Sequence, residues 1–128
     1  MKRDGLRRIL FVDDEADIRE IVQIALELTP QFLLQTAESG QRALQLMAES
    51  PPDLVLLDVQ MPQLDGPATL RRMRAEEKLA HIPVIFVTAK AMPRESSAYL
   101  AMGAAGVIPK PFDPYRLAEQ IFGMWERV

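Results

Sequence analysis

The side chains best suited to chemistry in this sequence stand where short apolar runs end. Asp13 and Asp14 follow the first such run, Asp58 follows the third, and Thr88 follows the fourth. Lys110 comes one proline after the last run. Three carboxylates, a hydroxyl and an ammonium group suit a divalent cation and the negative oxygens of a phosphoryl group, provided that the fold brings them together.

The apolar runs alternate with stretches of helical period along the whole chain, a pattern typical of βαβ units. The runs predicted to be strands span residues 9–12, 32–36, 54–57, 84–87 and 107–108. Three of them are continuously apolar, as expected of central parallel strands that are covered on both faces. We therefore expect a single α/β domain over residues 1–128, with five parallel strands, five helices and no second domain.

The helices are predicted from apolar periodicity and from residues that start or stop helices. The first spans about residues 14–28, where apolar side chains recur at helical spacing. For the second helix, Ser39 is the predicted N-cap and Pro51-Pro52 the stop, and for the third, Pro67 lies in the first turn. The fourth helix is weakly predicted over about residues 94–102 and ends at Gly103. Asp113 and Pro114 predict the N-cap and the first position of the fifth helix.

Composition excludes several classes of function. The 128 residues include 15 Lys and Arg, 18 Asp and Glu and no Cys, which gives a net charge of −3 and no disulfide. An acidic chain without a basic stripe argues against direct nucleic-acid binding. No stretch approaches the roughly 18 uncharged apolar residues of a membrane span, so we expect no membrane insertion and a cytoplasmic location. One histidine without cysteine builds neither a catalytic triad nor a His-based zinc site.

The candidate residues would meet where the strands of an open α/β sheet end, because ligands bind outside the carboxyl ends of such strands. If the first and third strands are neighbours, Asp13, Asp14 and Asp58 crowd together. Two carboxylates about 4 Å apart repel by roughly 4 kcal/mol at an effective dielectric near 20. A raised pKa on one acid would relieve this repulsion, and so would a hard divalent cation, for which Mg²⁺ fits best. With the Thr88 hydroxyl and the Lys110 ammonium, the set could stabilise a transferring phosphoryl group, with a carboxylate as acceptor.

Four separated motifs resemble the receiver domains of two-component response regulators. They are FVDDE at 11–15, LDVQMPQLDG at 57–66, VTA at 87–89 and KPF at 110–112. The motifs occur in the family's order, and the resemblance covers about residues 7–127. It implies a flavodoxin-like fold, namely a doubly wound five-stranded parallel sheet in the order 2-1-3-4-5 with five helices.

The resemblance implies a role for each matching residue. Asp58 would accept the phosphoryl group, while Thr88 and Lys110 would hold its oxygens. Asp13 and Asp14 would bind Mg²⁺ directly or through water. The implied set of metal ligands is Asp13, Asp14, Asp58 and the backbone carbonyl of Gln60. Gln60 and Lys90 would flank the path of the attacking water and tune the lifetime of the phosphoryl group.

The resemblance also implies partners. A sensor histidine kinase or a histidine phosphotransfer protein would supply the phosphoryl group from phosphohistidine. The chain would catalyse its own phosphorylation and dephosphorylation and act as a signalling switch, not as an enzyme with an external substrate. The face formed by the fourth helix, fifth strand and fifth helix would then bind a downstream protein target or output domain.

One position departs from the family pattern. Receivers of this type usually carry Tyr or Phe three residues before the lysine, and this chain has Val107 there. Because a β-branched side chain is small and stiff, we expect phosphorylation to change residues 88–91 and the fourth helix more than the fifth strand. Tyr99 on the fourth helix is expected to be half-exposed, with a share in the signalling surface as the alternative. The family also predicts a cis bond between Lys110 and Pro111.

Two functions of other classes remain open from the sequence. The first is an Mg²⁺-dependent phosphohydrolase of the haloacid-dehalogenase type, which also uses an aspartyl nucleophile. Such enzymes carry a second acid two residues after the nucleophile, where this chain has Gln60 after Asp58. The second is a receiver-shaped binding module that is never phosphorylated, which the missing aromatic residue makes worth testing.

Overall fold

The apolar runs form five strands in a computed structural model, which describes residues 5–128. The strands are β1 (Arg8–Val12), β2 (Leu33–Ala37), β3 (Leu54–Leu57), β4 (Val84–Thr88) and β5 (Gly106–Pro109). All pair in parallel, and their order in the sheet is β2-β1-β3-β4-β5. This confirms the parallel α/β fold and the strand order that the family resemblance implied.

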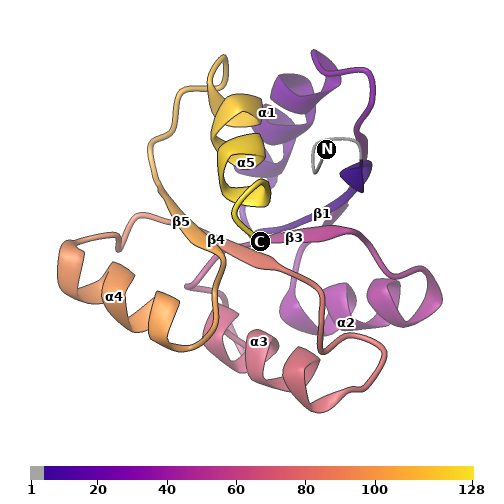
Figure 1. Cartoon of the computed structure of the whole chain (residues 1–128), viewed down its shortest axis with the longest axis vertical. Helices are drawn as coiled ribbons and strands as arrows, with labels where there is room; N and C mark the ends of the chain where they lie inside the picture. The colour runs from indigo at the N-terminus through magenta and orange to yellow at the C-terminus, as the bar shows by residue number, and fades with distance from the viewer. Residues whose placement is uncertain (1–4) are drawn as a thin grey trace.

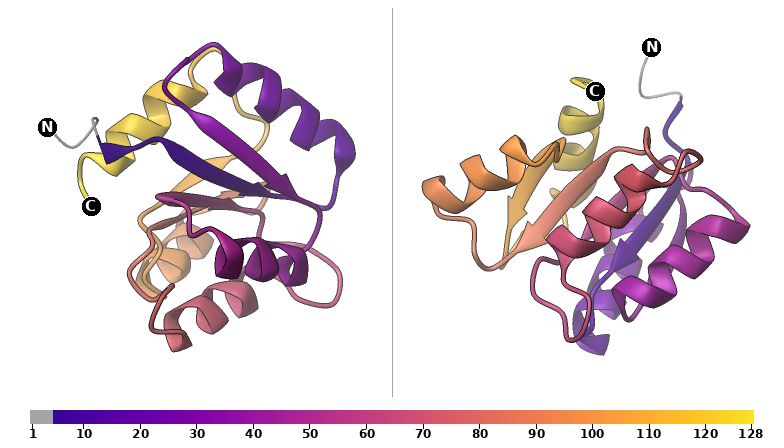
Figure 2. Two further views of the ribbon diagram at one scale, coloured as in Figure 1. Left: turned by 90° about the vertical axis from the view of Figure 1, so that its right-hand side faces the viewer. Right: turned by 90° about the horizontal axis from the view of Figure 1, so that it is seen from below.

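Within residues 5–128, four helices connect the strands, a fifth follows β5, and together they cover both faces of the sheet. They are α1 (Ala16–Glu27), α2 (Gly40–Glu49), α3 (Gly66–Ala75), α4 (Pro93–Ala101) and α5 (Leu117–Trp125). Helices α1 and α5 lie on one face, whereas α2, α3 and α4 lie on the other (Figure 1). The two perpendicular views in Figure 2 show the same arrangement, with the sheet between two layers of helices.

The core consists of two apolar clusters, one on each face of the sheet, because successive residues of a strand point in opposite directions. In β1, Phe11 faces α1 and α5, whereas Leu10 faces the side covered by α2 and α3. In β3, Leu56 and Leu57 divide in the same way, and all four side chains are buried. Each fully buried Leu or Phe stabilises the fold by roughly 1.5–3 kcal/mol. The sheet is therefore anchored on both faces, and the strand ends are held in fixed positions.

Local signals in the sequence explain where several helices begin and end. Ser39 caps α2, and its hydroxyl accepts a hydrogen bond of 3.1 Å from the backbone N–H of Arg42, as predicted. Helix α3 begins with Pro67 in its first turn, and the Asp65 carboxylate caps it by accepting a 2.8 Å hydrogen bond from Ala68. Gly103 ends the α4 segment with a φ of 102°, a conformation that glycine adopts without strain.

The predicted start of the fifth helix was wrong. The Asp113 carboxylate accepts a 2.9 Å hydrogen bond from Tyr115, and the Arg116 N–H bonds the Asp113 carbonyl at 3.0 Å. These bonds close a turn that contains Pro114, and α5 starts only at Leu117. An Asp-Pro pair begins turns as readily as helices, so the sequence pattern alone could not separate the two.

The remaining boundaries moved by one or two residues. Helix α1 starts at Ala16 instead of Asp14, β2 is shifted by one residue, and β5 extends one residue beyond the predicted run at each end. The prediction that Tyr99 is half-exposed was wrong, because only 6% of this residue is accessible. Among the described residues, no helix has the length and apolar character needed to cross a membrane.

Candidate functional site

The register of the sheet places the first and third strand ends side by side. Val12 in β1 pairs with Leu57 in β3, so Asp13 and Asp58 leave the sheet at the same level. The Asp58 N–H donates a 2.9 Å hydrogen bond to the Val12 carbonyl, and the Asp13 N–H donates one of 3.1 Å to Ala37 in β2. The backbone of both acids is thus fixed by extensions of the strand ladder.

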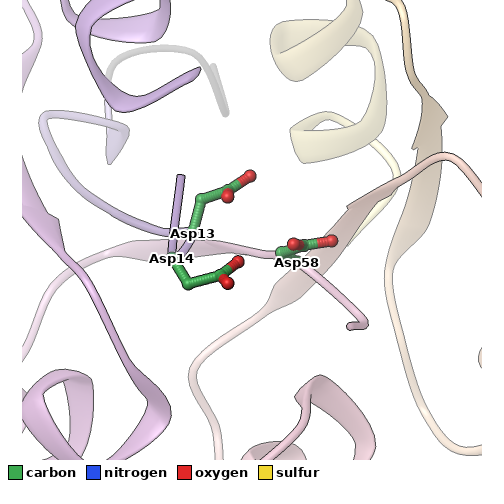
Figure 3. Close-up of side chains that lie close together, drawn as sticks. All are labelled: Asp13, Asp14 and Asp58. Carbon is green, nitrogen blue, oxygen red and sulfur yellow. The ribbon is translucent and has the colours of Figure 1, made fainter. Parts of the chain in front are cut away.

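Three carboxylates converge at this edge. One carboxylate oxygen from each of Asp13, Asp14 and Asp58 lies within 4.8 Å of the others, and Figure 3 shows the three side chains directed toward a common space. Asp13 and Asp58 are buried, whereas Asp14 is exposed. The resulting cluster, which we call the acid pocket, therefore has two fixed buried members and one member in contact with solvent.

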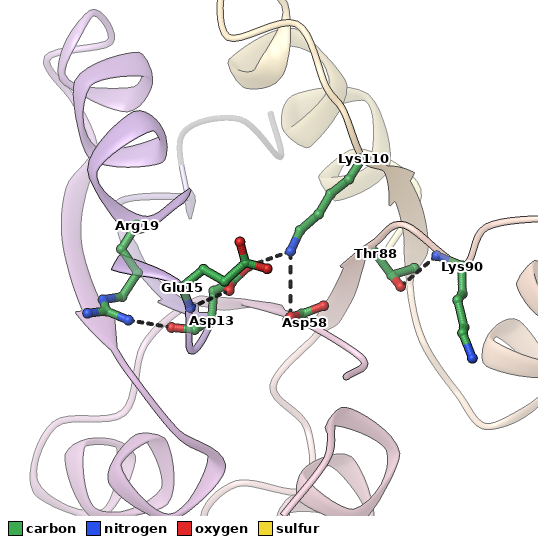
Figure 4. Close-up of polar contacts among 7 residues, drawn as sticks. All are labelled: Asp13, Glu15, Arg19, Asp58, Thr88, Lys90 and Lys110. Carbon is green, nitrogen blue, oxygen red and sulfur yellow. Dashed lines mark hydrogen bonds and ion pairs between the residues drawn. The ribbon is translucent and has the colours of Figure 1, made fainter. Parts of the chain in front are cut away.

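Lys110 provides the positive charge of the acid pocket. Its Nζ lies 2.6 Å from Asp13 Oδ2 and 3.5 Å from Asp58 Oδ2, between the two buried acids (Figure 4). The pairing of β4 with β5 brings it there, and the Lys110 N–H bonds the Thr88 carbonyl at 2.9 Å. The Lys110–Pro111 bond is cis, as predicted.

Further contacts hold Asp13 in place. Its Oδ1 accepts a 2.9 Å hydrogen bond from the Glu15 N–H, and its carbonyl accepts one of 2.7 Å from Arg19 Nη1 on α1 (Figure 4). Arg19 could not be identified from the sequence, because its contact depends on how the first turn of α1 folds back over the loop. Asp13 therefore has a positioned side chain and a positioned carbonyl.

The electrostatics of the acid pocket favour binding of an additional cation. Burial, and to a lesser extent the negative charge of Asp13, raise the pKa of Asp58 from 3.8 to about 6, although the nearby Lys110 opposes both effects. Burial alone would lower the pKa of Lys110, but its hydrogen bond to Asp13 and the charges of both acids raise it. Lys110 thus stays charged but only partly offsets the repulsion between the carboxylates.

Thr88 lies at the end of β4 and is buried. Its Oγ1 accepts a 3.0 Å hydrogen bond from the backbone N–H of Lys90, which holds the hydroxyl in the loop that follows the strand. The Lys90 side chain extends away from Asp58 (Figure 4). The structure therefore places Thr88 beside the acid pocket but does not bring the Lys90 ammonium into it.

Gln60 lies beyond β3 at the mouth of the acid pocket. Its side chain is exposed, and its backbone hydrogen-bonds Asp58, which lowers the pKa of that acid and so favours the ionised form. An open cavity of about 720 Å³ adjoins Gln60. The cavity is lined by Val59, Gln60, Met61, Pro62, Asp65, Lys90 and Tyr99. The cavity opens between the residues that follow Asp58 in the chain and Tyr99 on α4.

The donor set fits a hard divalent cation. Carboxylate oxygens are the ligands that Mg²⁺ prefers, and Mg²⁺ normally retains several waters, which the exposed side of Asp14 permits. Two or three negative charges with a single lysine also leave a local excess of negative charge. The residues present are therefore suited to hold Mg²⁺.

Comparison with known proteins identifies this arrangement. A sequence model of the response regulator receiver domain matches residues 9–122. The chain belongs to the response regulator receiver family. Its place in two-component signal transduction follows from that membership, and the acid pocket lies within the matched segment.

Relatives of this receiver include longer regulators. The receiver is 37% identical over 121 residues to the phosphate regulon transcriptional regulatory protein PhoB of Pseudomonas aeruginosa, and 40% identical over 109 residues to the regulatory protein AtoC of Escherichia coli. These matches cover 94% and 85% of the receiver but 52% and 23% of the two relatives. The chain thus spans about half of PhoB and a smaller share of AtoC.

Solved structures share the fold of this receiver. The chemotaxis response regulator CheY4 of Vibrio cholerae matches with a TM-score of 0.85 and 27% identity, over 93% of this chain and 98% of that chain. The signal receiver domain of a signal transduction histidine kinase from Syntrophus aciditrophicus gives a TM-score of 0.81 and 31% identity, over 95% of this chain and 92% of that chain. Both matches span nearly the whole receiver.

Proposed function

We propose that this receiver domain accepts a phosphoryl group on Asp58 and thereby acts as a switch in a phosphorelay. The observation that carries the proposal is the geometry at the strand ends: three convergent carboxylates with the Lys110 ammonium 3.5 Å from Asp58. The phosphoryl donor would be the phosphohistidine of a sensor histidine kinase or of a phosphotransfer protein. We place this exchange in the cytoplasm.

Asp58 would act as the nucleophile. With a pKa near 6 it is mostly ionised at pH 7, so a carboxylate oxygen can attack phosphorus while the P–N bond to the donor imidazole breaks. Lys110 would move only slightly from its present position to contact a phosphoryl oxygen on Asp58. The Thr88 hydroxyl would turn from the Lys90 N–H to donate to another oxygen.

The acid pocket would hold Mg²⁺ through Asp13, Asp14, Asp58 and the Gln60 carbonyl. When bound, the cation would neutralise charge that develops on the transferring oxygens. Hydrolysis of the acyl phosphate would then reset Asp58, with water arriving through the cavity lined by Gln60 and Lys90. The residues at that entrance would set the lifetime of the phosphorylated state.

The proposed output surface is the α4–β5–α5 face. Three large apolar side chains on or next to α4 are exposed, namely Met92, Leu100 and Met102. Solvent-exposed methionine and leucine side chains suit a partner that binds reversibly. A downstream protein or an output domain would use this surface when Asp58 is phosphorylated.

A second apolar surface supports docking of the phosphoryl donor. Ile21 and Ile24 on α1 and Leu28 directly after it are 40%, 58% and 65% exposed, and Tyr115 beside them is 86% exposed. Helix α1 follows directly after the acid pocket's Asp14, and Tyr115 lies in the segment that follows Lys110. A donor bound here would therefore lie beside the edge of the sheet that carries Asp58.

Incubation with acetyl phosphate and Mg²⁺ tests the proposal and separates it from the alternatives. We expect the intact mass to increase by one phosphoryl group in the wild type and to stay unchanged in Asp58→Ala. A phosphohydrolase would instead turn over small phosphate esters without retaining the group. A silent binding module would do neither, and either of these outcomes would overturn the proposal.

A further inference from the structure

Tyr99 is a buried aromatic residue on α4 that contacts the loop after β4. Its hydroxyl donates a 3.0 Å hydrogen bond to the Lys90 carbonyl, and only 6% of the residue is exposed. Its ring packs against Phe86 in β4 with 5.1 Å between the centroids and an angle of 58° between the planes. Tyr99 is thus held at both ends, by an apolar ring contact and by a backbone acceptor.

Lys90 connects Tyr99 to the Thr88 hydroxyl. The Lys90 N–H donates to Thr88 Oγ1 at 3.0 Å, while its carbonyl accepts from Tyr99. A continuous chain of two hydrogen bonds therefore runs from the end of β4 to the last turn of α4. Lys90 alone links the Thr88 and Tyr99 side chains, through its backbone N–H and its carbonyl.

Two other α4 side chains contact the same loop. Ser96 Oγ donates a 3.2 Å hydrogen bond to the Ala91 carbonyl, and the Glu95 carboxylate accepts one of 3.1 Å from the Met92 N–H. These contacts lie at the start of the helix and involve residues after Lys90. Tyr99 alone among the three contacts the residue that also bonds Thr88.

The neighbouring position in β5 has no side chain that could serve instead. Val107 pairs with Phe86 across the strands and packs, partly buried, against the cluster that contains Tyr99. A valine has no hydrogen-bonding group and few rotamers. The ring that packs beside Phe86 on this side of the sheet comes from α4.

We propose that Tyr99 is a positioning residue that transmits the state of the Thr88 hydroxyl to helix α4. The inference rests on the proposed phosphorylation of Asp58. When the Thr88 hydroxyl turns toward the phosphoryl group, the Lys90 N–H loses its acceptor. The backbone of Lys90 then reorients, and its carbonyl moves with it. A buried phenol hydroxyl is costly to leave unpaired, so Tyr99 follows the Lys90 carbonyl and α4 shifts with it.

The test compares two variants that each lose one hydroxyl from α4. Tyr99→Phe keeps the ring against Phe86 and removes only the bond to Lys90, whereas Ser97→Ala removes an exposed hydroxyl from the same helix. Backbone amide spectra are recorded before and after labelling with acetyl phosphate and Mg²⁺, and shifts are scaled to the phosphorylated fraction measured by mass.

We expect the α4 shifts of Tyr99→Phe to fall below half of the wild-type shifts, while residues 88–90 still respond and Ser97→Ala behaves as the wild type. Full α4 shifts in Tyr99→Phe would overturn the inference. Thr88→Ala, Tyr99→Phe and the double variant give a second check. If the losses of α4 shift in the two single variants add up in the double variant, the inference is also overturned, because two residues on one path should act as a unit. A purely structural role would lower the Tm and leave the scaled shifts unchanged. If acetyl phosphate and Mg²⁺ add no phosphoryl group to the wild type, the proposed function itself is refuted, and the inference with it.

Discussion

Replacing Asp58 with Asn should stabilise the receiver in the absence of divalent ions. The folded protein raises the pKa of Asp58 from 3.8 to about 6, mainly because the carboxyl is buried and faces Asp13. Ionising this acid is therefore harder in the folded state than in the unfolded chain. Asn has nearly the same shape and carries no charge, so it avoids this cost.

The magnitude follows from the difference in pKa. The two values differ by about 2 pH units, and each pH unit corresponds to 1.36 kcal/mol, which gives roughly 3 kcal/mol as an upper limit at pH 7. The cost is absent below pH 3.8, grows between pH 3.8 and 6, and is complete above pH 6. The stabilisation by Asp58→Asn should follow the same profile and shrink as the solution is acidified.

Urea and thermal unfolding in EDTA between pH 4.5 and 8 measure this effect. We expect a gain in Tm on the order of 10 °C at pH 7 and a small one at pH 4.5. Asp17→Asn, at an exposed position in the first turn of α1, is the matched control and should give no gain. A gain of equal size at both pH values, or none at pH 7, would refute the electrostatic reasoning.

Other predictions concern the metal, the lysine, the packing and the docking surface. Asp14→Asn should weaken Mg²⁺ binding at least tenfold in calorimetry. At pH values below 6, the Mg²⁺ affinity of the wild type should also decrease, because Asp58 takes up a proton. An unchanged affinity in either case contradicts the metal assignment. Lys110→Met should slow labelling by acetyl phosphate about 100-fold and still bind Mg²⁺, so an unchanged labelling rate would exclude Lys110 from the reaction. Gly66→Ala should cost about 1–3 kcal/mol in urea unfolding, because its Cβ would overlap the Asp58 carbonyl oxygen; wild-type stability would mean that the loop yields freely. Ile24→Lys should slow transfer from a phosphohistidine protein but not from acetyl phosphate, and equal slowing with both donors would argue against docking on α1.

The sequence predicted those parts of the fold that depend on local patterns. Continuous apolar runs identified the central strands, and Ser39 and Pro67 marked helix starts that the structure contains. The order of the strands came from the family resemblance, because nothing within a single strand specifies its neighbour. Where one residue type serves two local structures, as Asp113 does in a turn instead of a cap, the pattern failed.

The part of the candidate site that lies at the ends of strands could be predicted from the sequence. Asp13, Asp58 and Lys110 could be expected to meet once the strands were placed, and the structure brings them together. The orientation of Tyr99 could not be predicted, because α4 has no clear apolar stripe and either Tyr99 or the adjacent Leu100 could face the sheet. The structure buries Tyr99 and exposes Leu100, a choice that depends on the space beside Phe86.

Chemical trapping of the modified residue tests directly whether Asp58 accepts the phosphoryl group. The receiver is labelled with acetyl phosphate and Mg²⁺, reduced with borohydride, and mapped by peptide mass spectrometry. Because borohydride reduces an aspartyl phosphate to homoserine, we expect homoserine at position 58 and at no other aspartate. Homoserine at Asp13 or Asp14, or none in a protein that has gained a phosphoryl group, would contradict it.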